Sequence, residues 1–235
     1  MSMKSFAKLP TFDPETGDAL AVIETPKGSR NKYGYNEALE VFELRKVLPR
    51  GMLFPYDFGF IPSTVGQDGD PLDVLLLLDD PAPMGCVIRV RVVGAILAEQ
   101  LEDKSRWIRN DRLIAVATHA QLHGNVRKLK ELNPRILDEM EAFFHQYNRM
   151  QDKEFRPLDR CGPKRALELI QKGRAKFANG KGVVGFRRRG QSPLQQARRG
   201  DRSRACLPFP HHCERSEAIH RSTASSAHEV PKAVV

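Results

Sequence analysis

Short stretches of apolar residues, either alternating with polar ones or running together, occur along the first half of the chain. Each stretch is rich in Val, Ile or Leu and is bounded by Gly, Pro or Asp, a pattern typical of β-strands separated by turns. The predicted strands cover residues 19–25, 41–44, 72–78, 86–97 and 113–118. Several short strands of this kind predict a closed or nearly closed antiparallel barrel.

The stretch at 86–97 shows the clearest alternation. Side chains of successive strand residues point to opposite faces of a sheet, so the sequence predicts two faces for this strand. One face would carry Val87, Arg89, Arg91 and Val93, and the other Ile88, Val90 and Val92.

Two helices are predicted after the strands. Asn133 followed by Pro134 is a good start signal, because Asn caps a helix and Pro suits its first turn. Apolar residues then recur at helical spacing and predict one buried face: Ile136, Met140, Phe143, Phe144 and Tyr147. A shorter helix is predicted from Pro163 to about Gly180. Its inward residues would be Ala166, Leu167, Ile170 and Phe177.

The net charge of +9 is unevenly distributed. From residue 181 onward there are 11 Lys and Arg against 4 Asp and Glu, whereas the first 180 residues carry 27 against 25. The basic excess therefore lies in a C-terminal segment that lacks sustained periodicity, which predicts disorder. We expect one domain over residues 1–185 and a basic, disordered tail over 186–235. The nearly balanced domain makes nucleic acid an unlikely main partner.

Cysteine usage and hydropathy indicate a cytoplasmic protein. The four cysteines, Cys86, Cys161, Cys206 and Cys213, are scattered, which favours free thiols. Cys206 and Cys213 lie near three histidines in the sequence, but their spacing matches none of the usual zinc-binding pairs. The longest apolar run, at 74–78, is far too short to cross a bilayer, and no secretory signal is expected at the N-terminus.

Candidate chemistry is concentrated in the segment Asp68-Gly69-Asp70-Pro71-Leu72-Asp73. Asp68 and Asp70 would face the same side of an extended segment, and Asp73 follows the proline bend and can converge on them. A few carboxylates that leave coordination positions for water suit Mg²⁺. An EF-hand loop is disfavoured, because Leu72 occupies its fifth position and Asp79 replaces the closing glutamate. On spacing alone, a solvated acidic turn is the alternative.

Residues 68–74 resemble the signature Asp-x-Asp-Pro-x-Asp-hydrophobic of the soluble (family I) inorganic pyrophosphatases. Other matching segments follow in family order, at 22–24, 32–33, 54–60, 83–94, 112–116 and 143–147, so the resemblance covers about 19–180. It implies an α+β fold that is mainly β, an OB-like five-stranded antiparallel barrel with two C-terminal helices. It also implies Mg²⁺-dependent hydrolysis of pyrophosphate to two phosphates in a chain that forms homo-oligomers.

The resemblance further implies roles for individual residues. Asp70 would hold the nucleophilic water as general base, and the metal site would comprise Asp68, Asp70, Asp73, Asn110 and Glu24. Phosphate oxygens would be held by Lys32, Arg45, Arg112 and Tyr147. Taken one at a time, the cations are equally typical of an ordinary protein surface, and Tyr147 of helix packing. Their joint occurrence in family order favours the functional interpretation.

Several positions depart from the family pattern. Phe54 and Phe58 stand where tyrosines are expected, Asn110 where a metal-binding aspartate is expected, and Gly34 and Asn148 where an acidic residue and a lysine are expected. An acidic pair is replaced within residues 99–101. These departures favour two alternatives: a slow pyrophosphatase, or a hydrolase of another phosphoanhydride. A third alternative is an OB-like binder of nucleic acid or polyphosphate that does not turn its ligand over. Barrels that bind single-stranded nucleic acid usually stack bases on aromatic side chains, but residues 191–235 contain a single aromatic residue, Phe209.

Overall fold

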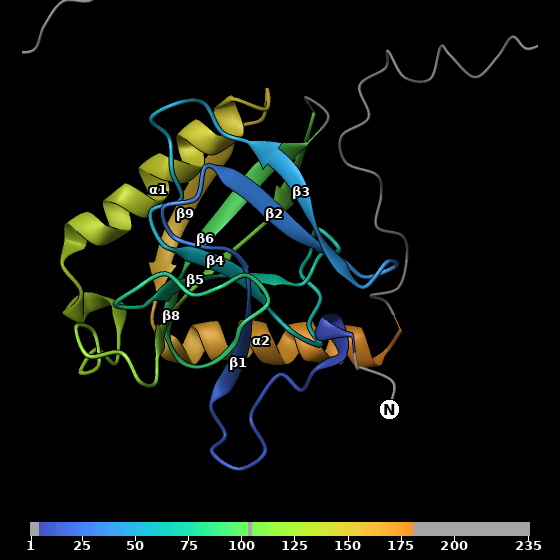
Figure 1. Cartoon of the computed structure of the whole chain (residues 1–235), viewed down its shortest axis with the longest axis vertical. Helices are drawn as coiled ribbons and strands as arrows, with labels where there is room; N and C mark the ends of the chain where they lie inside the picture. Colours follow the sequence, from blue (N-terminus) through green and yellow to red (C-terminus); the bar gives the residue numbers. More distant parts are fainter. Residues whose placement is uncertain (1–4, 103–104, 181–235) are drawn as a thin grey trace, which may run out of the picture. The chain divides into compact units, whose positions relative to one another are not determined.

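The computed structural model of the protein describes residues 5–102 and 105–180. In this part of the chain, five strands close into a ring (Figure 1). The order around the ring is β1 (Ala19–Thr25), β4 (Asp57–Ile61), β5 (Leu72–Leu77), β8 (Arg112–Ala117) and β6 (Val87–Glu102), and β6 pairs with β1 again. The predicted five-stranded barrel with flanking helices is therefore confirmed.

One pairing in the ring is not antiparallel. β5 runs parallel to β8, with Leu75 opposite Ile114, whereas the other neighbouring pairs of the ring are antiparallel. A parallel pair requires a long crossover. Here β6 and β7 (Arg106–Arg109) lie between the two strands in the sequence. Alternation within a single strand carries no information about the direction of its neighbour.

Several strands lie outside the predicted stretches. β2 (Asn31–Asn36) and β3 (Val41–Val47) form a separate two-stranded sheet, and only the first part of β3 was predicted. β4, β7 and β9 (Phe155–Cys161) were not predicted, and both β7 and β9 pair with β6 outside the ring. Short 3₁₀ helices occur at η1 (Phe6–Lys8) and η2 (Leu129–Glu131).

The two predicted helices are α1 (Pro134–Arg149) and α2 (Pro163–Ala178). The Asn133 side chain accepts a hydrogen bond from the Arg135 backbone N–H, as expected of an N-cap. Both helices have 16 residues, so the prediction of a shorter second helix was wrong. Leu167 is 39% exposed instead of inward, because α2 presents the stripe Ala166, Ile170 and Gly173 to the barrel.

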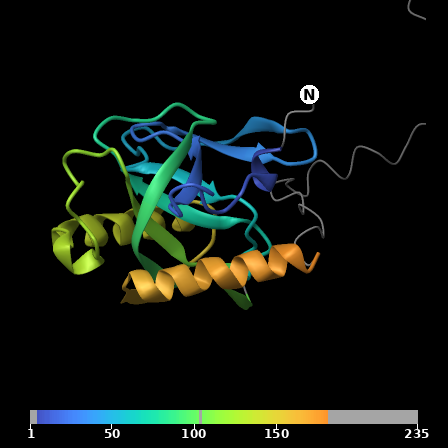
Figure 2. The ribbon, with the colours of Figure 1, turned by 90° about the horizontal axis from the view of Figure 1, so that it is seen from below.

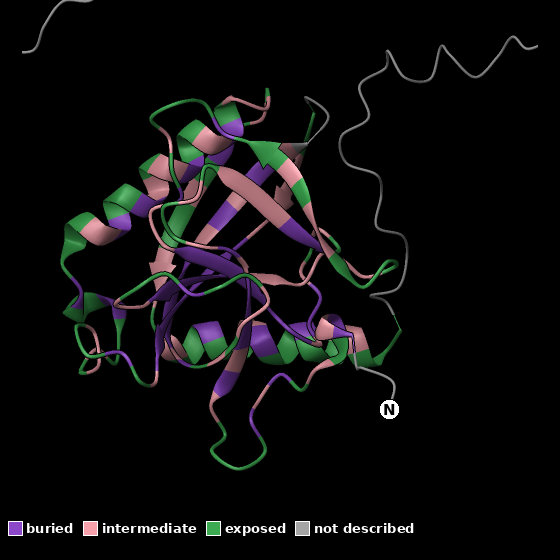
Figure 3. Cartoon of the chain, viewed as in Figure 1, coloured by how far each residue is buried: buried purple, intermediate pink, exposed green. Residues whose placement is uncertain are grey.

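The helices cover opposite faces of β5. Val74 and Leu76 belong to the same core cluster as Ala166 and Ile170 of α2. Leu75 and Leu77 belong to the cluster that contains Leu137, Met140 and Phe144 of α1. Because both faces are covered, residues 74–77 of β5 are an unbroken apolar run instead of an alternating one. Figure 2 shows α2 along one side of the barrel, and Figure 3 shows the buried residues concentrated in the ring strands.

The predicted faces of β6 are interrupted at Val93. The register with β8 shifts between Val92 and Gly94, so Val93 is an extra residue in the ladder. Val92 and Val93 are both buried because both faces of the strand are covered: Val92 belongs to the core cluster that contains Ala166 and Ile170, and Val93 to the cluster that contains Met140 and Phe144. Such a bulge increases the local twist, which a small closed barrel requires.

The predictions about the cysteines, membrane-spanning segments and the C-terminal tail have different outcomes. Cys86 and Cys161 are free thiols. Among the described residues, no helix is long and apolar enough to cross a membrane. The predicted disordered tail and the Cys206 and Cys213 thiols lie outside the described residues.

Candidate active site

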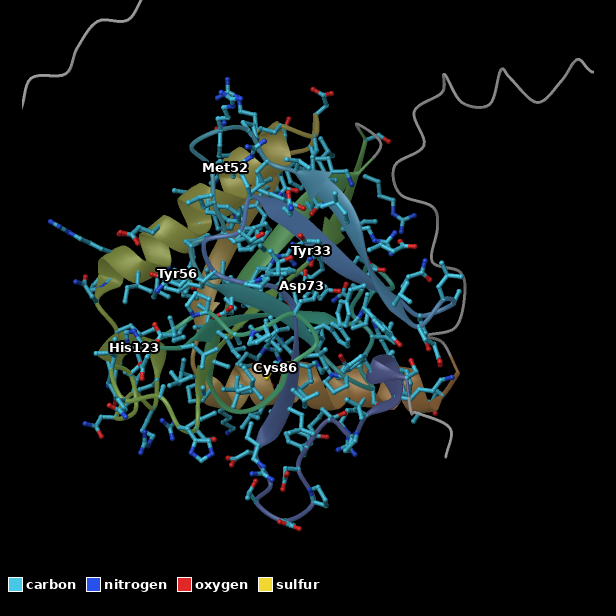
Figure 4. The ribbon with its side chains drawn as sticks, in the orientation of Figure 1. Tyr33, Met52, Tyr56, Asp73, Cys86 and His123 are labelled. Atoms are coloured by element: carbon cyan, nitrogen blue, oxygen red, sulfur yellow. The ribbon has the colours of Figure 1, made fainter. Side chains whose placement is uncertain are left out.

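The three aspartates of the predicted motif lie where the chain enters β5. Asp68 and Asp70 belong to the connection between β4 and β5, and Asp73 is the second residue of β5 (Figure 4). We call residues 65–71 the acidic loop. Its shape is held internally, because the Gly66 N–H donates to the Asp70 carbonyl at 2.7 Å and the Asp70 N–H donates to Asp68 Oδ1 at 3.2 Å. Gly69 at the tip has a φ of +91°, a region that favours glycine.

The carboxylates perturb one another. Burial raises the pKa of Asp68 to about 7, and the negative charges of Asp70 and Asp73 add to this effect. Burial also raises the pKa of Asp73 to about 6, while the Arg112 and Lys32 cations act in the opposite direction. Partly buried carboxylates whose pKa values are raised by burial and by neighbouring negative charges lack sufficient positive charge. A cation bound beside them would therefore be stabilised.

Two of the predicted substrate-binding cations lie next to these carboxylates. Arg112 is 4% exposed, and its Nη1 lies 2.5 Å from Asp73 Oδ2 and also donates to Asn110 Oδ1. Lys32 Nζ lies 2.7 Å from Glu24 Oε2 and 4.2 Å from the centre of the Phe58 ring. The structure therefore brings four predicted residues, Glu24, Lys32, Asp73 and Arg112, into one cluster of charges.

Tyr147 lies at the edge of the same cluster. Burial raises the pKa of its phenol to about 12, and the charges of Arg112, Asp73 and Glu24 also act on it. Its ring packs against Phe54 at 5.9 Å between centroids. Tyr147 is thus both a packing residue and a neighbour of the site, so the two interpretations of this tyrosine are compatible.

The space that the Arg45 side chain occupies depends on Gly34, one of the departures from the family pattern. Arg45 lies on β3, and its Nη1 contacts Glu43 at 2.9 Å. A Cβ atom added to Gly34 would lie 3.1 Å from Arg45 Cγ and 3.2 Å from Arg45 Nε. Glycine at position 34 therefore provides the space that the Arg45 side chain occupies.

The other departures have distinct structural consequences. Phe54 and Phe58 are buried, 5.8 Å apart between ring centroids, and extend the core to the edge of the site. Asn148 is buried and donates to the Phe144 carbonyl in its own helix, so it is part of α1 packing. Asp111 accepts hydrogen bonds from the Ala98 N–H and from Arg109 Nε, and is engaged there instead of replacing Asn110.

A cavity of about 90 Å³ lies between the acidic loop, residues 109–111 and α2. Asp68, Asp73 and Asn110 line it, together with three cations that the sequence-based prediction missed: Arg109, Lys172 and Lys176. Lys172 and Lys176 are spaced four residues apart, which places them on one face of a helix. That spacing was visible in the sequence, but nothing in it indicated that this face would border the acidic loop.

The donor set fits a divalent cation in its chemistry. Carboxylate and amide oxygens suit Mg²⁺ and similar hard cations, and the raised pKa values of Asp68 and Asp73 indicate missing positive charge. The ligand sphere is not closed, however. Within the described ranges, no group of three or more His, Cys, Asp or Glu side chains is arranged to hold a metal ion. Arg112 occupies the space between Asp73 and Asn110.

Fold and site together define a class of protein. It is a small barrel in which acidic side chains lie beside cationic ones, an arrangement suited to binding a small phosphate compound and metal ions at the same time. Comparison with protein families matches residues 21–178 to the family described as inorganic pyrophosphatase. The inorganic pyrophosphatase of Nostoc is 36% identical over 140 residues, which cover 60% of this chain and 80% of the relative. That of Thermus thermophilus is 33% identical over 180 residues, covering 77% and 100%.

Solved structures give the same result. The crystal structure of the Thermus thermophilus inorganic pyrophosphatase superimposes with a TM-score of 0.68 at 32% identity and covers 74% of this chain and 99% of that one. An Anaplasma phagocytophilum structure described as an inorganic phosphatase superimposes with a TM-score of 0.66 at 29% identity, covering 73% and 99%. The chain belongs to the inorganic pyrophosphatase family, as the sequence motifs indicated, and is a hydrolase that acts on the anhydride bond of pyrophosphate.

Proposed function

We propose that the chain hydrolyses pyrophosphate to two phosphates with Mg²⁺ as its divalent cation. The observation that carries this proposal is the position of Asp73, whose charge interacts with Arg112, Lys32, Glu24 and Asp70. One carboxylate thus connects the acidic loop to the cations expected to hold phosphate. When bound, the divalent cation supplies charge neutralisation and lowers the pKa of water.

In this proposal different residues bind the cations, accept the proton and bind the phosphate. Asp68, Asp70 and Asp73 hold the cations, with Glu24 and Asn110 at the edge of the site, and Asp70 accepts the proton of the attacking water. Lys32, Arg45 and Arg112 bind the phosphate oxygens. Arg112 Nε is buried without a hydrogen-bond partner, which makes it a donor available to such an oxygen. Tyr147 would donate its phenolic proton, and its raised pKa keeps that proton in place.

Substitution of Asp70 by Asn is the direct test. The variant keeps the shape of the side chain and loses its basicity, so we expect phosphate release from Mg²⁺-pyrophosphate to fall by about 10²–10⁴-fold. Wild type and variant should be compared in the full chain and in a chain that ends at Lys181. Activity should survive the truncation. If purified wild-type protein and Asp70→Asn release phosphate from pyrophosphate equally slowly, the proposal is wrong.

A second candidate substrate is a longer phosphoanhydride. The specific observation in its favour is the cavity lined by Asp68 and Asp73, whose walls also carry Arg109, Lys172 and Lys176. Rates on tripolyphosphate and ATP, compared with pyrophosphate at equal Mg²⁺, decide between the two. A rate on tripolyphosphate equal to or above that on pyrophosphate would favour the longer substrate.

The cytoplasmic location and the homo-oligomeric state remain predictions. The nucleic-acid-binding alternative predicts salt-dependent binding that disappears with residues 181–235. The oligomeric state can be measured by light scattering on the full chain.

A further inference from the structure

Helix α2 contacts the acidic loop, although none of the predicted site residues lies on it. The contact is made at Gly173, which is buried in the middle of the helix. A Cβ atom at this position would lie 3.0 Å from Leu72 Cδ1 and 3.1 Å from Thr64 Cβ. Glycine within a helix costs about 1 kcal/mol relative to alanine. The close approach of helix and loop explains why glycine is found here despite that cost, because a side chain would press on Leu72 and Thr64.

Thr64 closes the two ends of the loop. Its side chain is 1% exposed, and its hydroxyl donates to the Ile61 carbonyl at 2.6 Å. The same oxygen accepts from the Leu72 N–H at 3.1 Å. One hydroxyl group therefore joins the last residue of β4 to the first residue of β5, directly beside Asp73. We call Thr64, Leu72 and Gly173 the latch.

Backbone contacts extend the latch into the acidic loop. The Val65 N–H donates to the Gly173 carbonyl at 3.1 Å, and Lys176 Nζ donates to the Gly66 carbonyl at 3.3 Å. The Gly66 N–H in turn donates to the Asp70 carbonyl at 2.7 Å. A continuous chain of contacts thus runs from α2 to the backbone of Asp70.

The loop requires such support because of the charges it carries. Asp68, Asp70 and Asp73 repel one another while they are ionised and no cation is bound, and this repulsion favours a more open loop. Residues 65–71 have no strand partners to oppose it. A group that fixes both ends of the loop reduces the reorganisation needed to bring the carboxylates around a cation.

We propose that Thr64 and Gly173 are positioning residues, through which α2 sets the separation of Asp73 from Asp68 and Asp70 and so the affinity of the site for divalent cations. The inference rests on the proposed function in one respect, namely that the acidic loop is where the divalent cation binds. Neither residue would supply a ligand to the cation, because the Thr64 hydroxyl is engaged with the Ile61 carbonyl and the Leu72 N–H, and Gly173 has no side chain.

The test is a titration with Mn²⁺ alone, followed by electron paramagnetic resonance of the free ion, on wild type, Thr64→Val, Thr64→Ser and Gly173→Ala. Valine removes the hydroxyl and serine keeps it. We expect Thr64→Val to weaken Mn²⁺ binding by about 10–100-fold, as the loss of a group that orients metal ligands typically does. Thr64→Ser should stay within about threefold of wild type. Gly173→Ala should weaken binding in the same direction, because the added methyl pushes on Thr64 and Leu72.

Thr11→Val is the matched control. Thr11 is also a buried threonine, 3% exposed, and its hydroxyl donates to the Pro62 carbonyl at 2.9 Å without contacting Leu72. We expect it to lower the melting temperature as Thr64→Val does and to leave Mn²⁺ affinity unchanged. Equal Mn²⁺ affinities for Thr64→Val and Thr11→Val would overturn the proposal, as would a serine variant as weak as valine.

The outcomes also separate this proposal from the proposed function. A wild-type protein that binds Mn²⁺ but does not hydrolyse pyrophosphate refutes the function and leaves the latch to be judged by the titration. A wild-type protein that binds no Mn²⁺ refutes the latch, whereas the proposed function is still judged by phosphate release from pyrophosphate with Mg²⁺. If Thr64→Val does not fold, Gly173→Ala decides, and wild-type affinity in that variant overturns the latch.

Discussion

The acidic loop and the segment that leads into β8 meet at Asp73. They differ in the charges that they carry and in the contacts that fix them. The acidic loop contributes carboxylates and is fixed from outside, by α2 and Thr64. The segment that leads into β8 contributes an amide, Asn110, and a buried guanidinium, Arg112, which contact each other directly. The first segment has the family motif intact, and the second departs from it. The carboxylates of the acidic loop therefore lie on one side of Asp73 and the Arg112 guanidinium on the other, where the Asp111 carboxylate is engaged with Arg109.

The largest loss of stability and activity is expected on substitution of Arg112. Arg112→Met leaves Asp73 without its 2.5 Å partner, and removing one member of a buried ion pair costs about 3–5 kcal/mol. The variant should unfold at markedly lower urea concentration. Its kcat/KM for pyrophosphate should fall by at least about 10²-fold, because the proposed donor to the phosphate is lost as well.

A matched control is Arg156→Met. Arg156 pairs with Glu99 at 2.6 Å but is half exposed, and exposed pairs contribute about 0–1 kcal/mol. Equal destabilisation by the two substitutions would show that the balance of charge at Asp73 is unimportant for stability.

The acidic loop predicts an intermediate effect of pH on stability. Without a metal, the pKa values of Asp68, about 7, and of Asp73, about 6, are higher than the value of about 3.9 in the unfolded chain. The folded state thus binds more protons between about pH 4 and pH 7. The free energy of unfolding should fall as pH rises through this window. Asp68→Asn should reduce that fall by an amount on the order of 2 kcal/mol.

The measurement is urea unfolding with EDTA at pH 4.5 and pH 7.5, in wild type and Asp68→Asn. Carboxylates with lowered pKa, such as Asp13 at about 2, titrate below this window and are common to both proteins. In the proposed function Mg²⁺ binds the ionised carboxylates, so adding it should restore stability at pH 7.5 in wild type and less so in the variant. A pH dependence identical in the two proteins would contradict the raised pKa of Asp68.

The smallest effect is expected at Asn110. Asn110→Asp adds a carboxylate opposite Asp73, and we expect it to tighten Mg²⁺ binding by up to about tenfold. Part of the added charge is taken up by Arg112, which already contacts this side chain. Calorimetric titration of Mg²⁺ into wild type and variant measures the difference. Weaker binding by the variant would show that the amide is required on this side of the site.

The sequence contained most of the information about the local elements. The strands at 19–25, 72–78 and 86–97 and the helix start at Asn133 were predicted from residue type and spacing, because these signals depend on neighbours within a few positions. β2 and β9 were missed since polar residues dominate them and their periodicity is weak. The acidic motif was identified because Asp68, Asp70 and Asp73 lie within six residues of the chain. Family order then indicated Glu24, Lys32 and Arg112 as their partners.

Tertiary structure decided what depends on contacts between distant residues. Closure of the ring pairs Ala19 with Val90, and the parallel pair joins Val74 to Leu113; neither the partner nor its direction is encoded within one strand. The bulge at Val93, the seating of Gly173 on the loop and the cavity beside Lys176 likewise arise only when remote segments meet. The sequence by itself determined which groups are the candidates for the chemistry, because their type and order are local properties. The fold decided which of these groups meet, and at what distance, because close packing is a property of the whole chain.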